Sequence, residues 1–216
     1  MSLVLRNIEN LSIVFDDHKL FADAFGSMLE TTGLFKHVSV FYEEKDVAAF
    51  LFKEKTPENI VLFLDYYIKD NTALNLFRDI KRIRFKCKVI IISTITNPVL
   101  IRDLIRYRPN AIISKSSSIE EVIKCLQQTD KEQIYLCPVI QSLLNDMPAE
   151  KALALTSREI EIIKLFATGK SAAEVAALLS LSQHTITAHR KKIFRKMDCN
   201  SITELLAIAR NLDLIY

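Results

Sequence analysis

The stretch IVLFLD (Ile60–Asp65) is a run of five apolar residues that ends in an aspartate. A run without polar alternation is typical of a strand that is buried on both faces of a sheet. Three similar stretches are LSIVF (Leu11–Phe15), KVIIIS (Lys88–Ser93) and NAIISK (Asn110–Lys115). HVSVFY (His37–Tyr42) is rich in β-branched and aromatic residues and predicts a fifth strand.

Segments with helical spacing of their apolar residues alternate with these strands. The predicted helices are Lys19–Glu30, Asp46–Lys53, Leu74–Ile83, Pro98–Tyr107 and Ile119–Gln127. Alternating strands and helices favour a parallel sheet with helices on both faces. The predicted fold class of this region is therefore α/β, a flavodoxin-like, doubly wound sheet of five parallel strands in the order 2-1-3-4-5.

Composition and charge separate the front of the chain from its tail. Half of the 216 residues are hydrophobic and a quarter are charged, which is globular composition. From Lys151 onward ten Lys/Arg face six Asp/Glu, whereas the first 150 residues hold 19 basic and 20 acidic residues. A basic tail is suited to a polyanion. Four cysteines without a CxxC pair, and no apolar run near the ~18–20 residues of a membrane span, predict a cytoplasmic protein with reduced thiols and no membrane partner.

Polar residues follow the apolar runs at successive strand ends. Asp16 and Asp17 follow the first strand, Asp65 ends the third, Ser93 the fourth and Lys115 the fifth. One such aspartate alone could simply cap the next helix. Because the carboxyl ends of parallel strands meet at one edge of a sheet, all five together predict a joint site.

The residue types at this edge indicate phosphoryl transfer. Three neighbouring carboxylates repel one another and need a cation, and hard oxygen ligands suit Mg²⁺. A carboxylate can also act as a nucleophile towards phosphorus. Lys115 could neutralise the phosphoryl oxygens and Ser93 could donate a hydrogen bond to one of them. We therefore expect one aspartate to accept a phosphoryl group with Mg²⁺ bound.

The tail is predicted to be an all-α domain of four helices. Its third helix lies in SQHTITAHRKKIFRKM (Ser182–Met197), which holds five Lys/Arg and no acid. An apolar stripe of Ile186, Ile193 and Met197 anchors that helix to a core. A cationic face is often merely solvated, but the short helix of Ser171–Ser182 just upstream favours a helix-turn-helix that binds DNA.

The N-terminal part of the second helix of such a motif meets the base edges of DNA. Thr187, Ala188 and Lys191 are predicted to contact bases. Lys192, Arg195 and Lys196 lie further along and are predicted to contact phosphates. The complete predicted DNA-binding set is Thr185, Thr187, Ala188, Arg190, Lys191, Lys192, Arg195 and Lys196.

The front 125 residues resemble a response-regulator receiver domain. FDDH (Phe15–His18) resembles the acidic pair of that family, and Asp65, Ser93 and Lys115 match its phosphoacceptor, its Ser/Thr switch and its invariant lysine. The resemblance implies that Asp65 and the second acid of the pair, Asp17, contact Mg²⁺ directly. It also implies that Asp16 contacts the ion through water and that the main-chain carbonyl of Tyr67 is a further ligand.

The tail resembles the helix-turn-helix of the LuxR/NarL/FixJ family. LTSRE (Leu155–Glu159) matches its opening, and Gly169 matches the glycine that ends its first helix. The resemblance implies that the last helix, Ser201–Leu214, forms a dimer, with Leu205, Ile208 and Ala209 at its interface. It also implies four partners: double-stranded DNA, a cognate histidine kinase, RNA polymerase and a second copy of the chain on DNA.

The interpretation is a two-domain, phosphorylation-controlled, sequence-specific transcription regulator of a two-component system. The predicted boundaries are 9–128 for the receiver, 129–152 for a linker and 153–216 for the DNA-binding domain. No enzymatic activity is expected beyond phosphorylation and dephosphorylation of its own aspartate.

Three alternatives differ in what they explain. A regulator of the same fold that is controlled by constitutive dimerisation or by a ligand would account for two departures from the receiver family. Lys69 and Asp70 form an unusual loop where the family usually has a Pro-Gly turn, and Ile112 stands at its aromatic switch position. A phosphatase of the haloacid dehalogenase type needs a second aspartate two residues after its nucleophile, where this chain has Tyr67. A small-molecule-sensing LuxR regulator would share only the tail.

Overall fold

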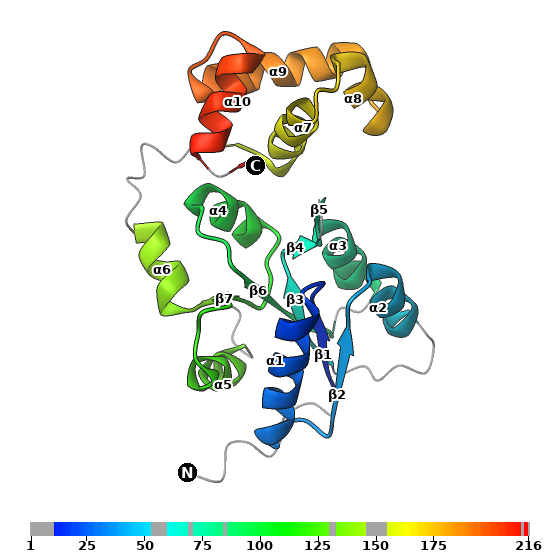
Figure 1. Ribbon diagram of the computed structural model, residues 1–216, viewed down its shortest axis with the longest axis vertical. Coiled ribbons are helices and arrows are strands. Elements are labelled where there is room, and N and C mark those ends of the chain that lie inside the picture. Colours follow the sequence, from blue (N-terminus) through cyan, green and yellow to red (C-terminus); the bar gives the residue numbers. More distant parts are fainter. Residues whose placement is uncertain are drawn as a thin grey trace. The chain divides into compact units, whose positions relative to one another are not determined.

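The computed structural model describes residues 11–52, 60–68, 71–83, 86–129, 133–145, 155–212 and 214–215 (Figure 1). Contacts between Cα atoms divide the chain into two units. One unit comprises Met1–Ile95 with Tyr107–Gln141, and the other comprises Thr96–Arg106 with Ser142–Tyr216. A doubly wound sheet lies in the first unit and a group of helices forms the end of the second.

The sheet has the strand order β2-β1-β3-β6-β7-β8, and every pair in it is parallel. Its five longer strands are β1 (Leu11–Phe15), β2 (His37–Phe41), β3 (Ile60–Asp65), β6 (Lys88–Ser93) and β7 (Ala111–Ser114). These are the five predicted strands, and their spatial order is the predicted 2-1-3-4-5. The prediction of the fold class is therefore confirmed.

A sixth, two-residue strand extends the sheet beyond the prediction. β8 (Tyr135–Leu136) lies in the segment predicted as linker and pairs with Ala111 and Ile112 of β7. The helix α6 (Pro138–Asn145) follows directly. A ladder of two residues carries too little periodicity to be recognised from sequence.

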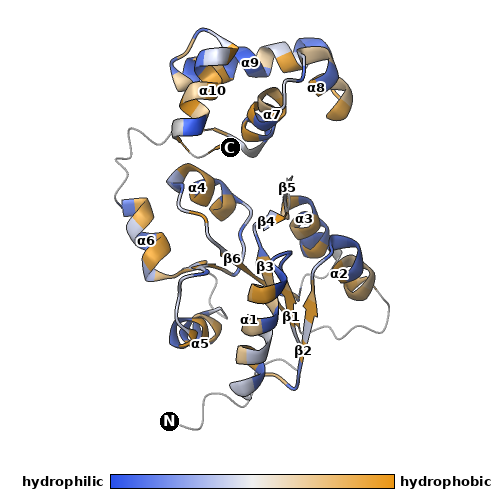
Figure 2. Cartoon of the chain, in the orientation of Figure 1, coloured by the Kyte–Doolittle hydropathy of each residue, from blue (hydrophilic) through white to orange (hydrophobic). Residues whose placement is uncertain are grey.

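Helices pack on both faces of the sheet. Helix α4 (Pro98–Arg106) follows β6 along the chain and falls in the second unit. The helices of the first unit that follow its strands are α1 (Lys19–Thr31), α2 (Glu44–Leu51), α3 (Leu74–Ile83) and α5 (Ile119–Gln128). Figure 1 shows α1 and α5 on one side of the sheet and α2 and α3 on the other. Cover on both faces is the reason that the strands lack polar alternation, as the orange strands of Figure 2 show.

The core lies between the central strands and these helices. Ile13, Phe15 and Phe63 have no exposed side-chain surface, and Phe25 of α1 meets Phe63 edge to face at 5.0 Å between ring centroids. Burying one such side chain contributes about 1.5–3 kcal/mol. Gly26 lets α1 approach the sheet closely, because a Cβ there would lie 2.6 Å from a methyl group of Val40.

A small antiparallel hairpin follows β3. It pairs β4 (Tyr67–Ile68) with β5 (Asn71–Thr72). The backbone N–H of Ala73 closes the segment by donating to the carbonyl of Tyr66 at 3.0 Å. Lys69 and Asp70, the pair named above as unusual, lie outside the described part of the chain.

The tail forms the predicted four helices. They are α7 (Ser157–Ala167), α8 (Ala172–Leu178), α9 (Gln183–Met197) and α10 (Ile202–Asn211). Each begins at a hydroxyl cap, and the cap residues are Thr156, Ser171, Ser182 and Ser201. An N-cap of this kind contributes about 1 kcal/mol. Four strong start signals explain why the sequence predicted these helices well.

The apolar stripe of α9 also matches the prediction. Ile186, Ile193 and Met197 of α9 are buried, so the apolar stripe does anchor this helix. Gly169 has a φ of +80°, the left-handed conformation that glycine adopts readily where a helix ends. In the described residues, no helix is both long and apolar enough to cross a membrane.

Candidate functional site

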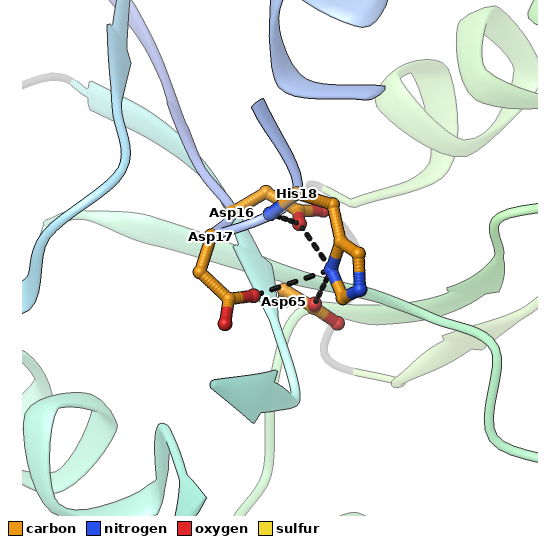
Figure 3. Close-up of side chains that lie close together, drawn as sticks. All are labelled: Asp16, Asp17, His18 and Asp65. Atoms are coloured by element: carbon orange, nitrogen blue, oxygen red, sulfur yellow. Dashed lines mark hydrogen bonds and ion pairs between the residues drawn. The ribbon is translucent and has the colours of Figure 1, made fainter. Parts of the chain in front are cut away.

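The strand ends bring three carboxylates and an imidazole together. Ligand atoms of Asp16, Asp17, His18 and Asp65 all lie within 4.8 Å of one another (Figure 3). Asp16 and Asp65 come from the ends of β1 and β3, which are hydrogen-bonded neighbours in the sheet. The expectation that acids from separate strands meet at one edge is therefore confirmed.

Lys115 joins this cluster from the end of β7. Its Nζ lies 2.6 Å from Oδ2 of Asp16 and 2.9 Å from Oδ2 of Asp65. Asp16 is fully buried and Asp65 is 1% exposed. The ammonium also lies over the ring of Phe21, 4.7 Å from its centroid. The ammonium of Lys115 is thus held close enough to Asp65 to pair with a negatively charged group attached to that carboxylate.

Burial and charge act against each other on the pKa of Asp65. Burial raises the pKa, the hydrogen bond from Lys115 lowers it, and the nearby charge of Asp16 raises it, which leaves the pKa at about 6. A carboxylate with this pKa is more basic than an ordinary aspartate and is ionised in most molecules at neutral pH. Both properties suit a nucleophile.

Ser93 lies at the same edge of the sheet. Its side chain is fully buried at the end of β6, and its Oγ accepts a hydrogen bond from the N–H of Ile95 at 3.3 Å. The N–H of Lys115 donates to the carbonyl of Ser93 at 2.9 Å. This bond ties the ends of β6 and β7 together, so Ser93 and Lys115 are positioned as one rigid edge.

The cluster fits a divalent cation. Three carboxyl groups face one ammonium, so acidic groups outnumber the basic one in a small volume. Buried carboxylates in excess of this kind are stabilised by a bound cation. The N–H of Tyr67 donates to Oδ1 of Asp65 at 3.4 Å. That bond holds the start of β4 beside the cluster, and the predicted role of the Tyr67 carbonyl as a ligand stays a prediction.

His18 is a member of the cluster that the sequence analysis did not assign. Its Nδ1 lies 3.2 Å from Oδ1 of Asp16 and 3.2 Å from Oδ1 of Asp17. The only signal in the sequence is its place directly after the acidic pair. Since α1 begins one residue later, the turn at His18 directs the imidazole back over the strand end.

The exposed side of α9 carries most of the predicted DNA contacts. Lys191, Lys192 and Arg195 are exposed, and Thr187 and Ala188 are partly exposed. The hydroxyl of Thr187 donates to the carbonyl of Gln183 at 2.9 Å. Its hydrogen is used within the helix, so the methyl group is the part best suited to a base contact.

Thr185 and Arg190 complete the predicted set, and both are partly exposed. Thr185 lies at the start of α9, where its N–H donates to Oγ of Ser182 at 3.0 Å. Arg190 precedes Lys191 on the helix. The individual roles of the set in binding DNA stay predictions.

Lys196 has a role that the sequence analysis missed. Its Nζ lies 2.6 Å from Oε2 of Glu159, which is 3% exposed. The same oxygen accepts the N–H of Thr156 at 2.7 Å and completes the capping box of α7. Burial raises the pKa of Glu159, but the hydrogen bonds and charge of Lys196 and the Thr156 N–H outweigh it, so the pKa is lowered. The ion pair gives Lys196 a role inside the domain, and its predicted phosphate contact stays a prediction.

A stability measurement distinguishes the two roles of Lys196. Lys196→Ala leaves Glu159 nearly buried without its cation, and we expect it to destabilise the helical domain by about 1–3 kcal/mol. Lys192→Ala removes an exposed lysine from the same helix and should change stability by less than about 0.5 kcal/mol. Amide hydrogen exchange of α7 and α9 in the full chain measures both. Equal protection in the two variants would refute the internal role.

The predicted dimer residues of α10 separate into two kinds. Leu205 and Ala209 have no exposed surface within the helical domain, so they form its core and cannot line an interface as predicted. Ile208 is partly exposed. The two faces of a short amphipathic helix cannot be assigned from its apolar spacing alone when both are partly apolar. The dimer prediction therefore rests on Ile208.

Two family descriptions match the chain. The response regulator receiver domain matches residues 13–127, more than half of the chain, and the family of bacterial regulatory proteins called luxR matches residues 153–209. The chain is a response regulator of the NarL/FixJ type. A response regulator with these two domains is a phosphorylation-controlled, DNA-binding regulator of transcription in a two-component system.

Two relatives are similar to the response regulator over most of their length and of its own. It is 25% identical to the transcriptional regulatory protein DesR of Bacillus subtilis over 193 residues, which cover 89% of this chain and 92% of DesR. It is 24% identical to the probable transcriptional regulatory protein NarL of Mycobacterium tuberculosis over 189 residues, 86% of each chain.

Solved structures show the same fold. The RcsB response regulator of Salmonella typhimurium superposes with a TM-score of 0.68 at 23% identity, covering 95% of this chain and 99% of RcsB. The response regulator in the RcsB–DNA complex gives a TM-score of 0.60 at 22% identity, covering 94% of this chain and 98% of that one. At these identities the likeness concerns the fold.

Proposed function

We propose that Asp65 of this response regulator accepts a phosphoryl group from a cognate histidine kinase or a small phosphodonor, and that this controls the binding of α9 to DNA. The observation that carries the proposal is the buried ion pair between Asp65 and Lys115 beside two further carboxylates. Burial of an aspartate among other acids does not stabilise the fold, and such arrangements are typical of functional sites.

The residues of the cluster have separate tasks in this proposal. A carboxylate oxygen of Asp65 forms the new bond to phosphorus while the bond from phosphorus to the donor breaks. Lys115 then pairs with an oxygen of the transferred group, and the hydroxyl of Ser93 donates to another. Asp16, Asp17, Asp65 and the carbonyl of Tyr67 would hold Mg²⁺. When bound, the ion neutralises charge that develops on the phosphoryl oxygens.

The DNA-binding step uses the exposed side of α9. Lys191, Thr187 and Ala188 contact base edges, while Lys192 and Arg195 contact phosphates. Thr185 and Arg190 add to the same surface. A second copy of the chain binds the other half of a two-fold DNA site, with Ile208 of α10 near the interface. RNA polymerase is the partner through which the bound dimer alters transcription.

The proposed domain boundaries are 9–128 for the receiver, 129–152 for the linker and 153–216 for the DNA-binding domain. The described part of the linker contains β8 and α6, so it is structured in part. The protein acts in the cytoplasm on DNA. The only chemistry proposed for the chain is phosphorylation and dephosphorylation of Asp65.

Selection of DNA sites from a random pool, with and without a phosphodonor, tests the proposal. We expect a two-fold sequence motif whose enrichment rises when the phosphodonor and Mg²⁺ are present. The same motif with equal enrichment under both conditions would favour a regulator of this fold that works without phosphate. No enrichment under either condition would contradict the DNA-binding role.

A further inference from the structure

His18 is placed as a ligand would be, although no role in the proposed phosphorylation step uses it. Its backbone N–H donates to Oδ1 of Asp16 at 2.9 Å, which fixes the residue against the end of β1. Its ring nitrogen Nδ1 lies 3.2 Å from Oδ1 of Asp16, 3.2 Å from Oδ1 of Asp17 and 4.0 Å from Oδ2 of Asp65. Figure 3 shows the three carboxylates converging on this nitrogen.

These separations are those of atoms that share one metal ion. Ligands at about 2.1 Å from an octahedral ion lie about 3 Å apart when adjacent and about 4.2 Å apart when opposite. The distances of 3.2 Å from Nδ1 to the two aspartates of the pair match adjacent ligands. The 4.0 Å to Asp65 approaches the value for opposite ligands. Ligand atoms of the four residues all lie within 4.8 Å of one another, so an ion would draw the most distant of them closer together.

The exposure of the ring is also compatible with coordination. The side chain of His18 is 70% exposed, whereas that of Asp65 is 2% exposed. The buried carboxylates therefore form the floor of the site and the imidazole forms its rim. With Nδ1 turned inward, the other ring nitrogen remains on the solvent side, where water can accept its hydrogen.

We propose that Nδ1 of His18 is a ligand of the divalent cation at this site, so that the site favours later first-row cations such as Co²⁺ over Mg²⁺. The proposal rests on the cation site of the proposed function. Mg²⁺ prefers oxygen ligands, whereas imidazole suits the later first-row metals. One imidazole beside three carboxylates thus changes the metal preference without adding charge.

Electron spin echo spectroscopy of the untagged full chain loaded with Mn²⁺ tests the coordination directly. A bound imidazole gives a nitrogen modulation that carboxylates cannot give. We expect this modulation in the wild type and its loss in His18→Ala, which still binds Mn²⁺ through its carboxylates. His37→Ala removes another exposed histidine, which lies in β2 at the end remote from the acids, and should keep the modulation.

Calorimetric titrations with Mg²⁺ and Co²⁺ give a second readout. The ratio of Co²⁺ to Mg²⁺ affinity should fall by at least about 10-fold in His18→Ala and stay unchanged in His37→Ala. Mn²⁺ bound without nitrogen modulation, or a ratio unaffected by His18→Ala, would overturn the inference while leaving the cation site intact. Failure of all three ions to bind would overturn the cation site itself, and the inference with it.

Discussion

Asp65→Asn is expected to abolish phosphorylation of the protein by a small phosphodonor in the presence of Mg²⁺. The substitution keeps the size and shape of the side chain but replaces the nucleophilic oxygen by a neutral amide. Asp65 is 1% exposed and paired with Lys115, so its neighbours remain in place while the reacting group is removed. Incorporation of the phosphoryl group, followed by intact-protein mass spectrometry, should fall to the background of a sample without donor.

Asp46→Asn is the matched control for this experiment. Asp46 is an exposed acid in the first turn of α2 and has no part in the cluster. The control variant should incorporate as much phosphoryl group as the wild type. If Asp65→Asn were still phosphorylated at the wild-type rate, the phosphoacceptor would be another residue and the assignment of the site would be wrong.

Lys191→Ala is expected to relax the base preference of the protein for its DNA site. Lys191 is exposed in the first half of α9, where a helix-turn-helix meets base edges. A lysine that donates to guanine acceptors contributes about 1–3 kcal/mol of discrimination. The ratio of the affinities for the preferred site and for a site mismatched at that base pair should therefore fall by about 5- to 150-fold. Competition binding with a single-base series of duplexes measures this change.

Lys192→Ala is the control for a phosphate contact. This variant should bind all duplexes more weakly, to the same extent. The slope of the logarithm of the affinity against the logarithm of the salt concentration should become shallower by about one. Lys196 is unsuitable for this purpose, because its ion pair with Glu159 stabilises the domain. If Lys191→Ala and Lys192→Ala changed base preference and salt dependence in the same way, the proposed division of contacts would be wrong.

The strands and the acidic edge could be predicted because their signals are local and repeated. Four of the five strands are short apolar runs that lead into a polar residue at the same edge of the sheet. The meeting of Asp16, Asp65 and Lys115 therefore followed from parallel topology alone. The helix starts of the tail were equally readable, since Thr156 and Ser171 each form a capping box.

What could not be predicted depends on contacts between distant residues or on which side chains are buried. Glu159 and Lys196 are 37 positions apart in the sequence, and a run of lysines gives no sign that one of them pairs with a buried glutamate. Leu205 and Ile208 are both apolar residues of α10, yet only Leu205 is fully buried. The position of the His18 ring over the acids depends on the turn before α1, and the geometry of that turn could not be predicted from the sequence.

The central claim is that the phosphoryl group on Asp65 controls DNA binding, and one titration tests it most directly. The affinity of wild type and Asp65→Asn for the selected DNA site is measured by fluorescence anisotropy, with and without phosphodonor and Mg²⁺. We predict that the phosphodonor strengthens binding by the wild type and leaves Asp65→Asn unchanged. An equal response of both proteins, or no response of a wild type shown to be phosphorylated, would contradict the account.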